Sequence, residues 1–194
     1  MAICDITLNG LAQACDASVG GIKNVYLAKF DDVVVAKAGV EAGELDMTIT
    51  EQTHPTADIT VKTSATKFQR YYVRRGSSSM TSTLTVDDAN GVSYVSTDLV
   101  LTFAKMDKEK RAEIEALTVK AADLAVIVED ANGQRWYLGA GNPVLRSAAA
   151  GQTGQAMGDA NNYSITLNDT SAYWPIPIKG DIDSIIESTT AAGE

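Results

Sequence analysis

The sequence predicts a mainly β protein, a β-sandwich or half-barrel with a long β-hairpin and one flanking α-helix. Two observations predict this fold class: runs rich in Val, Ile, Thr and Tyr that Gly, Asn and Asp interrupt, and a single segment with helical periodicity, 107–122. The chain has 194 residues, of which 45% are hydrophobic, so it can bury the core of one domain. We expect a single domain over 1–194, with an arm at 36–52 and a long loop at 142–162.

Strands are expected throughout the first third of the chain. The runs of β-branched and aromatic residues there are short and are bounded by polar residues and Gly, which is typical of strands. We place these strands near 3–8, 22–36, 45–50, 57–63 and 67–74.

The segment 79–105 alternates apolar and polar residues on both sides of Asn90-Gly91, a dipeptide that favours a two-residue hairpin turn. Such a turn pairs Val86 with Val95 and predicts a long two-stranded ribbon. We expect its apolar face to meet the core: Met80, Leu84, Val86, Val95, Leu99, Leu101 and Phe103. The other face is rich in hydroxyl and carboxylate groups: Thr81, Thr83, Thr85, Asp87, Tyr94, Ser96, Asp98 and Thr102.

One amphipathic helix is expected over 107–122. Asp107 is a favourable N-cap residue because its carboxylate can accept a hydrogen bond from the first turn. Ile114, Leu117 and Ala121 recur on one helical face. We expect burial of this apolar stripe to supply most of the energy that docks the helix.

The helix is followed by a second hairpin, whose turn is expected at 132–133 with Ile127 opposite Leu138. Both faces of its strands are apolar, which indicates a central position in a sheet. A strand at 163–167 follows. The segment 174–178 contains two prolines, which cannot donate to a ladder, so it can form only an edge strand or an extended tail.

Composition argues against several classes of function. The chain carries 25 acidic and 16 basic residues, a formal net charge of −9, and therefore offers no basic surface for wrapping nucleic acid. No secretion signal opens the sequence, and no run approaches the roughly 18 apolar residues of a membrane span, so we expect no membrane partner. Cys4 and Cys15 are too few for a disulfide framework or a zinc site.

No pattern in the sequence predicts catalysis. His54 is the only histidine, and it precedes Pro55 in a polar stretch typical of a surface loop. Nucleotide-binding glycine motifs and nucleophile elbows do not occur. Asp181 and Asp183 lack the further ligands that a metal site needs. We expect no catalytic residue, no metal and no cofactor, and hence no enzyme.

The one basic cluster, 67–75, interleaves Lys and Arg with aromatic residues. That pattern fits stacking on nucleic acid, but it also fits a strand whose basic residues meet acids on another subunit. The acidic balance of the chain favours the second interpretation.

The order of these elements resembles that of the tail tube proteins of bacteriophages and of the inner tubes of contractile injection systems. The resemblance covers about residues 80–178. It rests on a ribbon that ends in Leu-Val-Leu-Thr-Phe (99–103), a helix, a strand pair that ends in Trp-Tyr-Leu-Gly (136–139), a glycine-rich loop and a further strand.

The resemblance implies a subunit that forms hexameric rings, which stack into a hollow tube through which DNA passes without specific binding. Partners would be other copies of the chain and other tail proteins, in a virion tail made in the bacterial cytoplasm. The polar face of the ribbon would then line the lumen, with Thr83, Thr85, Asp87, Ser96 and Asp98. From charge, we expect contacts between subunits or rings at Glu41, Glu44, Asp46, Lys67, Arg70, Arg74 and Arg75.

Two alternatives remain open at this point. A β-sandwich binding module of a virion or cell surface, with a carbohydrate or protein ligand, would share the alternation, and Tyr71, Tyr72, Trp136 and Trp174 would form its platform. A small hydrolase would need acids that converge on His54.

Overall fold

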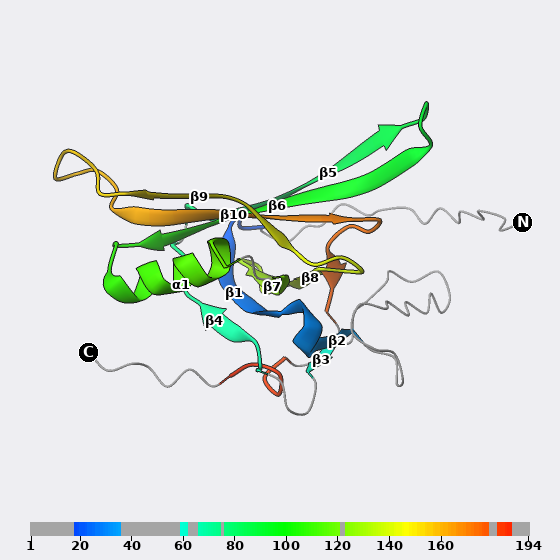
Figure 1. Cartoon of the computed structure of the whole chain (residues 1–194), viewed down its shortest axis with the longest axis horizontal. Helices are drawn as coiled ribbons and strands as arrows, with labels where there is room; N and C mark the ends of the chain where they lie inside the picture. The colour runs from blue at the N-terminus through cyan, green and yellow to red at the C-terminus, as the bar shows by residue number, and fades with distance from the viewer. Residues whose placement is uncertain are drawn as a thin grey trace, which may run out of the picture.

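The computed structural model describes residues 18–35, 59–61, 66–74, 76–120, 123–178 and 182–187. Within these ranges the protein consists of two antiparallel sheets that pack face to face, a two-stranded sheet and one α-helix (Figure 1). The predicted fold class is therefore confirmed. The predicted arm at 36–52, the strands at 3–8 and 45–50, His54 and both cysteines lie outside the described residues.

Eleven strands and one α-helix make up the described fold. The five-stranded sheet has the order β11 (Ile176–Pro177), β8 (Arg135–Leu138), β7 (Leu124–Asp130), β1 (Ile22–Lys29) and β4 (Gln69–Tyr71). The four-stranded sheet has the order β5 (Ser79–Asp87), β6 (Val92–Ala104), β10 (Asn162–Ser171) and β9 (Leu145–Gln152). A 3₁₀ turn, Phe30–Asp32, separates β1 from β2 (Val33–Val35), which pairs with β3 (Ile59–Val61). The helix α1 spans Lys108–Thr118.

The main core lies between the two large sheets. Leu99 and Leu101 of β6 are fully buried in one cluster with Val126 and Val128 of β7. The opposite face of the five-stranded sheet carries a second cluster, in which Tyr137 packs with residues of β1, β2, β3 and the segment 182–187. Both faces of β7 are buried, as expected for the second hairpin.

The helix begins where the sequence predicts. The Asp107 carboxylate accepts a hydrogen bond from the Lys110 backbone N–H at 2.8 Å, which satisfies one of the free donors of the first turn. Leu117 is buried, and Ile114 packs against the same core. The helix ends at Thr118, four residues earlier than predicted.

Both hairpin registers differ from the prediction, because an aspartate enlarges each turn. Asp87 accepts hydrogen bonds from two loop N–H groups, so the loop has four residues and Leu84, not Val86, pairs with Val95. A shift of two residues leaves each residue on its predicted face. Leu84 and Val86 do not meet the core as predicted but are exposed, because β10 pairs with β6 only as far as Val95. In the second turn Asp130 accepts hydrogen bonds from the backbone N–H groups of Asn132 and Gln134. As a result, Val126 rather than Ile127 pairs with Leu138.

The expected long loop at 142–162 is wrong. Residues Leu145–Gln152 form β9, which pairs with β10 along the sheet edge, and only 153–161 connects the two strands. Every residue of β9 is exposed, and its Ala-rich sequence has neither alternation nor strand propensity, so its backbone pairing with β10 defines it. The predicted strand at 22–36 is likewise broken by the 3₁₀ turn.

We expect Gly151→Val to destabilise this edge. A Cβ at Gly151 would lie 2.8 Å from Cε1 of Tyr163, which is closer than van der Waals contact allows. The change should lower the free energy of unfolding by about 1–3 kcal/mol, as overpacking does, measured by urea denaturation. Ala150→Val, on the other face of the same strand, is the control. An equal effect at both positions would contradict the packing of Tyr163 over Gly151.

Candidate functional site

The outer face of the four-stranded sheet, turned away from the core, is mostly polar on β5, β6 and β10, and β9 adds small or apolar residues and Gln152. We call this face the polar wall. Its members follow from the strand registers: Ser79, Thr81, Thr83, Thr85 and Asp87; Val92, Tyr94, Ser96, Asp98, Val100, Thr102 and Ala104; Asn162, Ser164, Thr166, Asn168 and Thr170; Leu145, Ala148, Ala150 and Gln152. Thr102, which the sequence predicted on the exposed face, is buried, and its hydroxyl donates to the Ser77 carbonyl oxygen at 2.8 Å. None of the other members is buried. Two carboxylates are its charged side chains, and it contains no Lys or Arg.

The five residues predicted to face a lumen all lie on this wall. Thr83 pairs directly with Ser96, and Asp98 lies two residues further along β6. Thr85 and Asp87 follow towards the turn. That these side chains share the exposed face is thus confirmed, while their position in a lumen stays a prediction.

A hydrogen-bonded network of side chains joins β6 to β10 across the wall. The Asn168 amide donates to Ser96 Oγ at 2.9 Å and to Asp98 Oδ1 at 2.8 Å, and its own oxygen accepts from Thr170 Oγ1 at 2.9 Å. This network ties the Asp98 carboxylate to its neighbours. Sequence analysis missed Asn168 and Thr170 because the predicted strand stopped at 167.

The second carboxylate of the wall is held in its charged form. Hydrogen bonds from the side chain and backbone of Asn90 hold the pKa of Asp87 below its usual value. The hairpin turn therefore carries negative charge at neutral pH.

The basic residues predicted for subunit contacts separate in the structure. Lys67 and Arg74 are exposed. Arg70 is engaged within the chain: its guanidinium donates to Asn24 Oδ1 at 2.7 and 3.2 Å and lies 4.6 Å from the centre of the Tyr72 ring. Glu41, Glu44, Asp46 and Arg75 lie outside the described residues.

Arg70 belongs to a polar cluster at the end of the five-stranded sheet. Glu129 is buried there, and it accepts hydrogen bonds from Lys23 Nζ at 2.9 Å, Asn24 Nδ2 at 2.7 Å and Tyr26 OH at 3.3 Å. Burial raises the pKa of Glu129, but these hydrogen bonds outweigh it and hold the pKa below the usual value. The cluster contains no nucleophile with an adjacent base, so its chemistry is that of a structural clamp between β7, β1 and β4.

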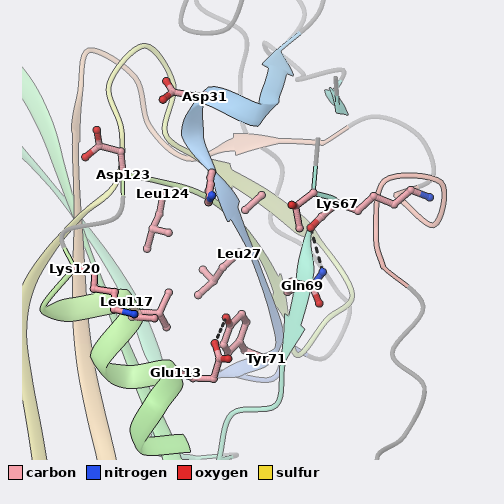
Figure 2. Close-up of a pocket in the computed structure, with 14 residues that line it drawn as sticks. Leu27, Asp31, Lys67, Gln69, Tyr71, Glu113, Leu117, Lys120, Asp123 and Leu124 are labelled. Atoms are coloured by element: carbon pink, nitrogen blue, oxygen red, sulfur yellow. Dashed lines mark hydrogen bonds between the residues drawn. The ribbon is translucent and has the colours of Figure 1, made fainter. Parts of the chain in front are cut away.

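A pocket of about 520 Å³ lies between α1, β1 and β4 (Figure 2). Its floor is apolar, with Leu27, Leu117 and Leu124. Tyr71 OH donates to Glu113 Oε2 at 3.2 Å, and burial together with this carboxylate raises the pKa of Tyr71. The charged residues at its rim do not converge on one point in Figure 2, so no catalytic geometry is present in this pocket.

A second pocket, of about 670 Å³, adjoins β11. We call it the aromatic pocket, and its lining residues are Gln134, Trp136, Ala172, Tyr173, Trp174, Pro175, Ile176 and Pro177. Two of the four aromatic residues suggested as a ligand platform meet here, while Tyr71 and Tyr72 line a different hollow beside α1.

Comparisons with known proteins add no relative. No family model, curated protein or solved structure matches the chain. In the part of the chain that the structure describes, no cluster of three or more His, Cys, Asp or Glu residues could hold a metal ion. No helix there is long and apolar enough to cross a membrane.

One buried carboxyl group is unusual. Asp169 of β10 points towards the core, is 4% exposed, and its Oδ1 has no hydrogen-bond partner among the described residues. Burial raises its pKa to about 6, although the backbone N–H of Gly139 donates to the carboxyl.

We expect Asp169→Asn to stabilise the protein at neutral pH. The folded-state pKa lies above the ordinary 3.8, so the stability that protonation contributes is present below about pH 4 and lost as the pH rises to about 6. The variant should raise the free energy of unfolding by about 1–3 kcal/mol near pH 7, with a gain that shrinks towards pH 4. Urea denaturation across this range, with Asp88→Asn as exposed control, tests it. A gain independent of pH would contradict the assignment.

Proposed function

We propose that this chain is a structural subunit that assembles into stacked hexameric rings and so forms the hollow tail tube through which phage DNA is delivered. The observation that carries the proposal is the polar wall: β5, β6 and β10 present hydroxyl, amide and two carboxylate groups on the face opposite the core, and β9 extends this face without a basic residue. The family resemblance of the sequence supports the same function.

A wall of this composition suits a conduit for DNA. Phosphate binding in proteins depends on Lys and Arg, because they release the counterions that surround the nucleic acid. A wall without cations holds no phosphate, and Asp87 and Asp98 repel it. DNA can therefore slide past without specific binding, and the subunit needs no catalytic residue or cofactor.

The two edges of the four-stranded sheet support assembly. β5 forms one edge and β9 the other, and both are exposed along nearly their whole length. Exposed edges carry unpaired backbone donors and acceptors, which another copy can satisfy. Pairing of β5 with β9 of the next copy would extend the polar wall into a closed barrel. Other tail proteins would meet the ends of the tube in the virion.

The second candidate function is a binding module for carbohydrate or protein. The observation that favours it is the exposure of Tyr173 and Trp174 in the aromatic pocket, because aromatic side chains are common platforms for ligands. A persistent monomer that binds an oligosaccharide array, and loses that binding in Trp174→Ala, would replace the tube proposal.

We expect the purified protein to form rings or hollow tubes. Negative-stain electron microscopy over a range of concentrations measures this directly. Formation should increase with concentration, since each ring is an association of copies. A monomer at every concentration would contradict the proposed function.

Lysines on the wall should convert the tube into a DNA binder. We expect assembled Thr83→Lys/Thr85→Lys to bind short duplex DNA at least about tenfold more tightly than the wild type at low salt, with binding lost as salt rises. Fluorescence anisotropy measures this. The control, Ala112→Lys/Val119→Lys, adds the same charge around α1. Equal binding by both variants would show that the wall does not face the DNA path.

A further inference from the structure

The end of the ribbon extends beyond the sandwich. β6 pairs with β10 only from Val95 onwards, where it meets Ser171, whereas β5 and β6 remain paired to Asp87 and Val92. Three further residue pairs span about 10 Å, and the four-residue turn adds to this length. Figure 1 shows the hairpin projecting past the end of β10. We call residues 84–94 the ribbon end.

The ribbon end continues the apolar row of the core into solvent. Leu99 and Leu101 are fully buried, but Leu84 and Val86, on the same face, are 49% and 55% exposed. No described element covers them within the chain. Apolar area of this kind favours contact with another apolar surface by about 25 cal/mol per Å² buried.

The aromatic pocket is the complementary surface on the same chain. Trp174 is 55% exposed and Tyr173 is 40% exposed, and the adjacent prolines make the backbone rigid. Trp and Tyr in such a setting are the residue types that dominate binding energy at interfaces.

Charge favours the aromatic pocket over the pocket beside α1 as the partner of the ribbon end. The residues that line the aromatic pocket include no Lys, Arg, Asp or Glu. The pocket between α1, β1 and β4, by contrast, is lined by six charged residues: Lys29, Asp31, Lys67, Glu113, Lys120 and Asp123. The acids of the ribbon end, Asp87 and Asp88, lie on its other face and in the turn. The apolar face with Leu84 and Val86 would therefore bury the charges of that pocket without pairing them, which is costly, whereas the aromatic pocket imposes no such penalty.

We propose that the ribbon end of one copy docks in the aromatic pocket of a second copy, with Leu84 and Val86 against Trp174 and Tyr173. This inference rests on the proposed function, since it names a second contact between subunits in addition to the pairing of sheet edges. Because the two surfaces differ, the contact is heterologous: each copy uses its ribbon end towards one neighbour and its pocket towards the other. Such contacts close into rings or continue along a filament, and they give the assembly a direction.

Two variants that each retain one surface test the inference. The ribbon variant is Leu84→Asp/Val86→Asp, and the pocket variant is Tyr173→Ala/Trp174→Ala. Each alone should require at least about tenfold more protein to assemble than the wild type does, as expected for loss of interface anchors. An equimolar mixture of the two should form a dimer, because one junction with an intact ribbon end and an intact pocket remains. Mass photometry measures these species.

The control, Ala112→Asp/Val119→Asp, places the same charges at exposed positions around α1, outside both docking surfaces, and should assemble like the wild type. Circular dichroism checks that every variant is folded. If the wild type assembles and both variants assemble equally well, or if the mixture yields no dimer, the docking is wrong and the tube proposal stands. If the wild type is monomeric at all concentrations, the proposed function fails, and a mixture without a dimer then overturns the docking as well.

Discussion

The packing of one sheet on the other determines which residues this protein presents to its surroundings. Strands alternate their side chains, so once Leu99 and Leu101 are buried against Val126 and Val128, every other residue of β6 must face outward. The same constraint passes through the ladder to β5, β10 and β9. The polar wall therefore consists of the residues that alternate with those of the core. A shift of one residue in the register of any strand would exchange its two faces and so expose core residues and bury wall residues.

Alternation explains how much could be predicted from the sequence. Which residues share a face of the ribbon was predicted correctly although its register was wrong by two residues, because alternation defines a face and the turn defines the register. Alternation does not show how far the core extends, so the exposure of Leu84 and Val86 and the burial of Thr102 were missed. The second hairpin has apolar residues on both faces, so alternation could not test its predicted register. The Asp130 side chain enlarges its turn and shifts the register by one residue from the prediction. In β10 the buried Asp169 breaks the alternation, which hid Asn168 and Thr170. β9 has a central run of small residues, 147–151, which carries no alternation, so its pairing with β10 defines the strand.

Apart from Asp169 Oδ1, the described fold pairs its buried side-chain polar atoms, but it leaves its periphery incomplete. Glu129 finds three donors, and Asp107 caps its helix. In contrast, two sheet edges, an apolar ribbon end and an aromatic pocket have no partner within the described residues. Soluble monomers normally blunt sheet edges with charge or cover, and β9 has a single charged residue, Arg146. The proposed assembly would cover these edges and the exposed apolar groups beside them.

The sparse charge of the polar wall is as informative as its sign. A densely acidic surface would repel phosphate strongly, but it would also collect cations and oppose the approach of neighbouring copies. Hydroxyl and amide groups remain well hydrated and bind phosphate only weakly, so in the proposed tube a layer of water would separate DNA from the wall. Two carboxylates in each copy, repeated around the proposed ring, would add a repulsion that increases with the number of subunits. The proposed conduit would need no further chemistry from this face.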